Sequence, residues 1–263
     1  MKTETRRSEI IRLLEQKGSV QVDDLVAQFE VSHVTIRKDL TELEGRGLLR
    51  RTHGGATYAH KSLFNPSFGE KVNLQQAEKR AIAEAALKHI EEGDTLILGA
   101  GSTVLTLARL MKNQFRSLYI ITNSVPIAVE LVDTRWDILL TGGQVRQHSM
   151  ALIGPAAARN LESYYADKAF IGSTGVSLER GYTTPNPYMS EIVRVIIKAA
   201  DTVYALVDSS KLGHTTLASF ATLQEVDLLI TDQAAPQEFV QALERQRLAY
   251  HLAPFLAKTD QAG

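Results

Sequence analysis

Four polar side chains of the kind that contacts nucleic acid cluster near the N-terminus. They are His33, Thr35, Arg37 and Lys38. When a helix lies in a major groove, short polar groups reach base edges and cationic groups bind phosphates. This chemistry requires an exposed helical face that presents the four side chains together. An amphipathic helix whose polar face is merely solvated is the alternative interpretation.

The surrounding residues favour such a helix. Ser32 is a good N-cap because its hydroxyl can accept a hydrogen bond from an unpaired backbone N–H. Ile36, Leu40 and Leu43 follow at the spacing of one apolar stripe, which leaves the polar residues on the opposite face. The preceding residues predict two helices and then a tight turn, over 5–15, 23–29 and 30–32. Helix, helix, short turn and helix is the order of a helix-turn-helix unit.

A short hairpin is predicted after this helix, which Gly45 and Gly47 are expected to close. Two apolar residues, two arginines and a Gly-Gly turn make up 48–56, the pattern of the wing in a winged helix. The cations of such a wing would lie beside the phosphate backbone. Gly54 and Gly55 would let the main chain approach a groove edge. The alternative is an ordinary surface hairpin.

Composition limits the classes of protein to which the chain can belong. Its 263 residues suffice for one small and one medium domain, and 44% hydrophobic with 22% charged residues is ordinary for a globular protein. The absence of cysteine excludes a disulfide scaffold and a cysteine-ligated zinc site. The sequence shows neither a signal-peptide core nor an apolar run of roughly 20 residues. We therefore expect a cytoplasmic protein without a membrane partner.

The formal net charge of −1 does not by itself indicate a nucleic-acid binder. Contacts with DNA must then come from local clusters, of which three are Arg6-Arg7, Arg37-Lys38 and Arg50-Arg51. The seven histidines show no pair at a metal-ligand spacing on one helix. We therefore predict neither a metal site nor a cofactor.

Short apolar segments alternate with helical patterns from residue 77 onward. The predicted strands cover 95–98, 118–122, 138–141, 169–172, 203–207 and 228–231. The predicted helices cover 78–90, 104–111, 127–132, 156–164, 190–200 and 237–245. Continuous apolar strands separated by helices are typical of a parallel sheet with both faces covered. An α/β domain is therefore expected, with a loop-rich linker before it and a polar tail after it.

Small, polar or charged residues follow five of these strands, at the edge where open α/β sheets bind ligands. Gly99 to Thr103 lead directly into a helix, where backbone N–H groups and two hydroxyls could converge on an anion. This loop is neither a P-loop nor a dinucleotide fingerprint. Arg146 and Lys211 could add cationic clamps, while ordinary turn chemistry is the alternative for each loop. The candidate ligand-binding residues are Gly101, Ser102, Thr103, Asn123, Ser124, Gly143, Arg146, Asp208 and Lys211.

Three N-terminal motifs together resemble a known family. They are Val31-Ser32-x-x-Thr35-Ile36-Arg37-Lys38-Asp39-Leu40, Leu43-Glu44 and Gly47-Leu48-Leu49-Arg50-Arg51-Thr52-His53-Gly54-Gly55-Ala56. The combination is similar to the N-terminal signature of the DeoR family of bacterial transcriptional repressors, in which this unit binds operator DNA. The resemblance places the DNA contacts on Ser32, His33, Thr35, Arg37, Lys38, Arg51 and His53, with Gly54 in the wing turn.

The second half of the chain continues the resemblance. Its matching blocks are Gly101-Ser102-Thr103, Thr122-Asn123-Ser124, Gly142-Gly143-x-x-Arg146 and Asp208-Ser209-Ser210-Lys211. Effector domains of the family resemble ribose-5-phosphate isomerase and typically sense a phosphorylated sugar. The chain departs from the family where acidic residues are common, at Gly99, Thr174 and Pro187. The resemblance therefore implies that the residues that would bind the phosphate match the family, whereas those that would bind the sugar differ from it.

These patterns predict a winged helix-turn-helix domain over 1–57 and a Rossmann-like, ribose-5-phosphate-isomerase-like α/β effector domain over 77–254. The linker would cover 58–76 and the tail 255–263. The expected function is repression of a carbohydrate-utilisation operon, relieved by a phosphorylated sugar or related metabolite. One winged helix covers little DNA, so we expect a homo-oligomer, a dimer or a tetramer. The alternatives are an isomerase-like enzyme with a DNA-binding appendage, which the missing aspartates disfavour, and a transcriptional activator.

Overall fold

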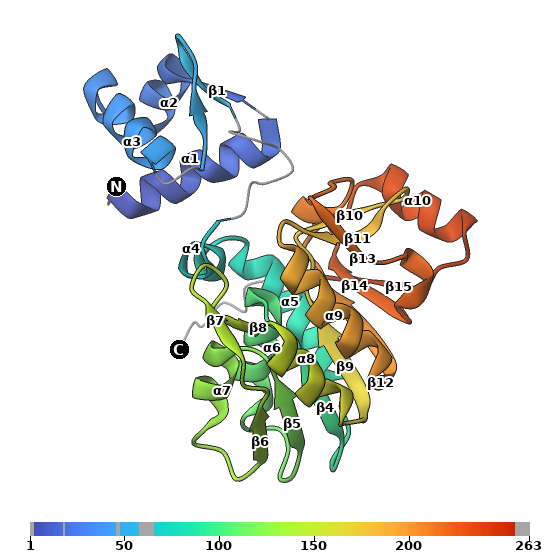
Figure 1. Cartoon of the computed structure of the whole chain (residues 1–263). Coiled ribbons are helices and arrows are strands. Elements are labelled where there is room, and N and C mark those ends of the chain that lie inside the picture. Colours follow the sequence, from blue (N-terminus) through green and yellow to red (C-terminus); the bar gives the residue numbers. More distant parts are fainter. Residues whose placement is uncertain (1–2, 18, 46–47, 58–65, 256–263) are drawn as a thin grey trace, which may run out of the picture. The chain divides into compact units, whose positions relative to one another are not determined.

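The chain folds into two compact units, Met1–Leu74 and Gln75–Gly263 (Figure 1). The computed structural model describes residues 3–17, 19–45, 48–57 and 66–255. Each unit has a hydrophobic core of its own. No helix in these described ranges has the length and apolar character needed to cross a membrane.

The part of the first unit that ends at Thr57 is a three-helix domain with a small antiparallel sheet. Its helices are α1 (Thr3–Lys17), α2 (Val22–Phe29) and α3 (His33–Gly45). Its strands are β1 (Ser19–Gln21), β2 (Arg50–Arg51) and β3 (Gly55–Thr57), in the order β1-β3-β2. The predicted helix-turn-helix and the predicted hairpin are both confirmed. The apolar stripe of Ile36, Leu40 and Leu43 is fully buried, as its helical spacing required.

The wing has one strand more than the sequence indicated. Residues 19–21 were expected to be only a connection, but they form β1 and pair with β3, with Val20 opposite Ala56. The close pairing depends on Gly55, because a Cβ there would lie 1.9 Å from the carbonyl oxygen of Val20. Gly55 therefore serves the packing of the wing on the domain.

A short helix, α4 (Phe68–Asn73), lies within the segment predicted to be a loop-rich linker. It begins with a capping box, in which the backbone N of Glu70 donates to Oγ of Ser67 and the carboxylate of Glu70 accepts from N of Ser67. The prediction of loop was wrong here because this reciprocal cap outweighs the helix-breaking neighbours. The remaining linker residues 58–65, the tail residues 256–263 and Gly47 lie outside the described residues.

The second unit is built on a seven-stranded sheet whose neighbouring strands are all parallel. Its strands are β4 (Thr95–Leu98), β5 (Tyr119–Thr122), β6 (Asp137–Leu140), β9 (Ala166–Ile171), β12 (Ala200–Leu206), β14 (Leu228–Asp232) and β15 (Tyr250–Ala253). Their order is β15-β14-β12-β9-β4-β5-β6. Six of these strands and the parallel sheet were predicted. Strand β15 was not predicted, because it is an edge strand whose mostly exposed residues form no continuous apolar run.

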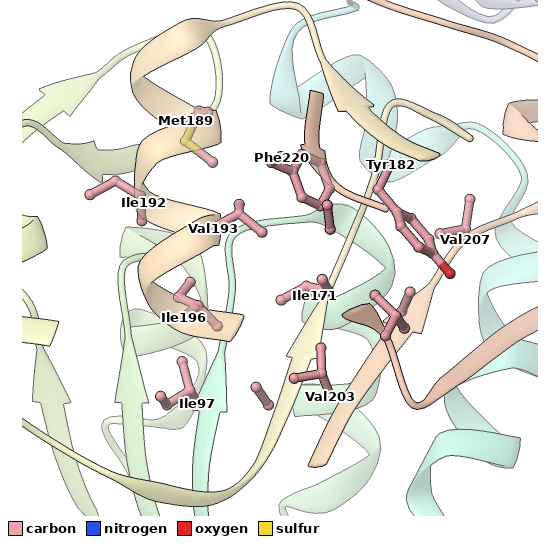
Figure 2. Close-up of a cluster of buried hydrophobic side chains, with 14 of the residues drawn as sticks. Ile97, Ile171, Tyr182, Met189, Ile192, Val193, Ile196, Val203, Val207 and Phe220 are labelled. Atoms are coloured by element: carbon pink, nitrogen blue, oxygen red, sulfur yellow. The ribbon is translucent and has the colours of Figure 1, made fainter. Parts of the chain in front are cut away.

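Helices cover both faces of this sheet. They are α5 (Gln76–Leu87), α6 (Ser102–Met111), α7 (Val125–Leu131), α8 (Pro155–Glu162), α9 (Pro187–Lys198) and α10 (Gln237–Arg245). Apolar residues of α8, α9 and α10 share one core with the strands. Helix α9 contributes Met189, Ile192, Val193 and Ile196 to this core beside Ile171 and Val203 (Figure 2).

Two smaller antiparallel sheets were not predicted. One joins β10 (Gly175–Ser177), β11 (Gly181–Thr184) and β13 (Ala218–Ala221), and the other is the hairpin of β7 (Gln144–Arg146) and β8 (Ala151–Ile153). The first packs Tyr182 and Phe220 onto the core beside Val207 (Figure 2). The strands of the two small sheets are short, and β11 pairs with β13, which is distant in sequence. Local sequence patterns therefore give little indication of these strands.

Candidate nucleic-acid interface and ligand crevice

Helix α3 begins as its sequence predicts. Oγ of Ser32 accepts a hydrogen bond from N of Thr35 at 3.2 Å and lies 2.9 Å from Oγ1 of Thr35. Both hydroxyls are therefore engaged in the helix cap of the free protein. Next to them, Nε2 of His33 lies 3.0 Å from Oδ1 of Asp23, which connects α3 to α2.

The inner face of α3 is held by a buried charge cluster. Asp39 is 2% exposed and accepts hydrogen bonds from Nε of Arg6 at 2.6 Å and from Nε of Arg7 at 2.9 Å. Burial opposes the charge of Arg7, but the hydrogen bond to Asp39 and the nearby carboxylates raise its pKa overall. The prediction that Arg6-Arg7 forms a cationic surface cluster is therefore wrong. These two arginines bind α1 to α3.

The outer face of α3 carries free cations. Arg37 and Lys38 are exposed, and their side chains make no hydrogen bond or ion pair with any described residue. Both lie one turn after Val34, which was not among the predicted site residues. Val34 is 76% exposed although it is apolar. Its spacing of three and four residues from Arg37 and Lys38 is the sequence feature that could have indicated Val34 as a site residue.

The two arginines of the wing differ in their contacts. Arg51 lies back along α3, where its Nη1 donates to Oγ1 of Thr41 at 2.8 Å. Its backbone N also donates to Oε1 of Glu44 at 2.8 Å. Arg50 is exposed, with no side-chain partner in the described ranges. Arg51 therefore connects the wing to α3, whereas the side chain of Arg50 projects into solvent.

The wing turn holds the other predicted contacts. His53 and Gly54 are exposed at its tip. The carbonyl of Gly54 accepts a hydrogen bond from N of Val22 at 2.8 Å, so the turn is anchored to the start of α2. The first unit therefore brings the predicted residues of the helix and the wing into one small domain.

The second unit has a topological switch point at β4. The chain runs from β4 to β5 and β6 in one direction, and β9 then returns on the other side of β4. In open α/β sheets such a point, at the carboxyl edge of the strands, is where ligands generally bind. Glycines of the loops after β4 and β9 face each other, because a Cβ on Gly101 would lie 3.8 Å from Cα of Gly172.

Residues 99–103 connect β4 to α6 at this edge. Helix α6 begins at Ser102, directly after Gly101, so the positive end of its dipole lies at the carboxyl edge. Ser102 is partly exposed, whereas Thr103 is buried. Gly99 packs closely on β9, since a Cβ there would lie 3.3 Å from the carbonyl oxygen of Phe170.

Asn123 and Ser124 are buried and hold the neighbouring loops. Oδ1 of Asn123 accepts from N of Ala100 at 3.0 Å, and its Nδ2 donates to the carbonyl oxygen of Leu152 at 3.2 Å. Oγ of Ser124 caps α7 by accepting from N of Ile127. In the free protein these side chains therefore position the β4 loop and the β7–β8 hairpin.

The hairpin places Arg146 at the same edge. Ser124 forms a bridge with Ala151, which in turn lies opposite Arg146 in the β7–β8 ladder. The Arg146 guanidinium is partly buried, and burial lowers its pKa. No described residue forms a hydrogen bond or ion pair with this side chain. Gly143 serves packing, because it has a φ of +108° and a Cβ would lie 2.8 Å from the carbonyl oxygen of Ile153.

The loop after β12 lies beyond β9 at this edge. Asp208 is buried and accepts a hydrogen bond from the hydroxyl of Ser210. Lys211 is partly buried and ends a short 3-10 helix. Because β9 lies between β12 and β4, these residues are at the same edge but not beside the β4 loop. The described ranges contain no group of three or more histidine or acidic residues able to hold a metal ion.

Two domain families match this chain. The DeoR-like helix-turn-helix domain matches residues 6–62, and the DeoR C terminal sensor domain matches residues 74–233. Among solved structures, ribose 5-phosphate isomerase A from Methanocaldococcus jannaschii is 21% identical over 51% of this chain and 53% of that chain, with a TM-score of 0.39.

Two curated relatives resemble the chain over most of its length. The HTH-type transcriptional repressor GlcR of Bacillus subtilis is 34% identical over 93% of this chain and 94% of that protein. The lactose phosphotransferase system repressor of Streptococcus mutans is 34% identical over 88% of this chain and 93% of that protein. The resemblance seen in the sequence motifs is confirmed, and the chain belongs to the DeoR family of transcriptional regulators.

Proposed function

We propose that this protein represses a carbohydrate-utilisation operon and releases its operator when a phosphorylated sugar or related metabolite binds. The observation that carries the DNA-binding part is the two-sided character of α3. Asp39 fixes the inner face to α1, while Arg37 and Lys38 project from the outer face without partners among the described residues. A firmly held helix with free cations is suited to binding in a major groove.

Arg146 supports an anionic effector. A partly buried guanidinium without a counter-charge is costly, and a bound phosphate would supply two-pronged hydrogen bonds to it. The N-terminus of α6 adds backbone N–H groups and a favourable dipole at the same edge. Since Gly99 and Thr174 carry no carboxylate, we infer that the effector differs from those usual in the family or is not held through its hydroxyls.

The effector must favour one of two states of the protein. Ligand binding weakens DNA binding only if the ligand has a higher affinity for the state that binds DNA more weakly. We propose that the protein acts as a homo-oligomer, a dimer or tetramer, because two α3 helices are needed to read two half-sites. Its role is binding and not turnover, and its relatives are named transcriptional repressors.

Genomic fragment retention tests the proposal. The purified full-length protein would be incubated with sheared genomic DNA at two salt concentrations, with and without a pool of sugar phosphates. Phosphate contacts are salt-sensitive, so fragments retained at the higher salt report base recognition. We expect one or two promoters upstream of carbohydrate genes, released by the pool. Sequence-independent retention, or turnover of a pool member, would contradict the proposal.

An Arg37→Ala variant tests the role of α3 in this experiment. It removes a free cation from α3 and leaves the second unit untouched, so we expect weaker retention with unchanged affinity for the sugar phosphate. Retention equal to that of the parent would show that α3 is not the DNA-binding element.

A further inference from the structure

Val34 is the most exposed of the large apolar side chains in the described chain, at 76%. It contributes nothing to the core of the first unit, which Ile36, Leu40 and Leu43 fill from the other face of α3. Helix propensity does not explain it either, because a β-branched residue is less favourable than alanine in a helix. Single exposed apolar residues are common on proteins, so the surroundings of Val34 decide its significance.

Those surroundings are the free cations of α3. Arg37 and Lys38 follow Val34 at i+3 and i+4, so the three side chains share one face of the helix. The neighbours of Val34 in the first turn are already engaged, since His33 contacts Asp23 and Thr35 contacts Ser32. Val34 is therefore the free side chain at the N-terminal end of the helix, where recognition helices meet base edges.

The chemistry of the major groove offers one apolar target. Base edges there present hydrogen-bond donors and acceptors, except for the C5-methyl group of thymine. A valine side chain has no donor or acceptor and can only make an apolar contact. We propose that Val34 determines operator specificity by packing against a thymine methyl group, while Arg37 and Lys38 bind beside it. This inference rests on the proposed function, because it requires sequence-specific DNA binding.

Uracil substitution tests the inference directly, since uracil lacks only that methyl group and pairs like thymine. A preferred duplex would first be enriched from a random-sequence library with the full-length protein. Each thymine in it would then be replaced by uracil, one at a time, and the Kd measured. We expect one thymine per half-site at which the replacement weakens binding about fourfold, as for one buried methyl group.

The Val34→Ala variant connects this effect to the side chain. Alanine keeps the helix and removes the two methyl groups, so the variant should bind the thymine and uracil duplexes with nearly equal affinity. Val132→Ala is the matched control, because Val132 is also an exposed valine, 73% exposed, but lies in the second unit. It should keep the sensitivity of the parent.

The outcomes separate this inference from the proposed function. An enriched duplex with no uracil-sensitive position overturns the role of Val34 and leaves the regulator intact. Full sensitivity in Val34→Ala does the same, since the methyl group would then be read by another residue. If no sequence is enriched at all, both the proposed function and this inference fail.

Discussion

Arg51 of the wing donates a hydrogen bond from Nη1 to Oγ1 of Thr41 in helix α3, at 2.8 Å. The same threonine hydroxyl donates to the carbonyl oxygen of Arg37 at 2.8 Å. The wing and helix α3 are thus joined through the side chain of Arg51, which the sequence resemblance placed on DNA. Glu44 adds a second link between wing and helix by accepting from N of Arg51.

Arg50→Ala and Arg51→Ala should weaken DNA binding in different ways. Arg50 is free to bind a phosphate, so its loss should reduce the slope of log K against log salt by about 1. Arg51 holds the wing against α3, so its loss should lower affinity with little change in that slope. Binding titrations at four salt concentrations distinguish the two. If Arg51→Ala alone reduces the slope, Arg51 leaves Thr41 and contacts DNA in the complex.

Asp39→Asn should destabilise the first unit by about 3 kcal/mol, because the buried guanidinium of Arg6 would lose its counter-charge and the partly buried Arg7 would lose one of its two carboxylate partners. Urea unfolding would be followed by far-UV circular dichroism. Fluorescence of Trp136, the single tryptophan, reports separately on the second unit. The fluorescence transition should not move. The control Asp24→Asn changes an exposed carboxylate in α2 and should cost less than about 1 kcal/mol. A cost for Asp39→Asn as small as this would show that the cluster does not stabilise α3.

Arg146→Gln should weaken binding of the sugar phosphate that releases DNA by about 10-fold to 100-fold, the range for a charge-assisted hydrogen bond. Calorimetric titration of the free protein measures this change. Arg159→Gln is the control, because Arg159 is an exposed arginine on α8. Equal affinities in the two variants would place the anion away from the β7–β8 hairpin.

Ser102→Asp should produce a repressor that no longer releases DNA. The new carboxylate at the start of α6 would repel a phosphate while it remains compatible with the helix dipole, so the fold and DNA affinity should be kept. The measurement is DNA retention with increasing sugar phosphate. Ser102→Ala, which adds no charge, should still release DNA. Normal release by Ser102→Asp would locate the phosphate elsewhere.

The sequence by itself determined the elements and their order. The stripe of Ile36, Leu40 and Leu43 predicted α3, and Ser32 predicted where it begins, because helix periodicity and capping are local properties. Six apolar segments predicted six strands of the parallel sheet for the same reason. The polar residues at their ends predicted a ligand edge, since parallel strands place their carboxyl ends together.

Only the tertiary structure decided which side chains are free. The sequence suggests that Arg6 and Arg7 are surface cations, but packing of α1 on α3 buries Arg6 and partly buries Arg7 against Asp39. Arg50 and Arg51 are the same residue type and adjacent in the sequence, but they occupy alternate positions of a short strand. As a result Arg51 contacts α3 and Arg50 is exposed. Such differences depend on tertiary packing, because the partners of Arg6, Arg7 and Arg51 lie in a different helix or strand from the arginine itself. The residue types therefore predicted the chemistry, and the fold selected the residues available for it.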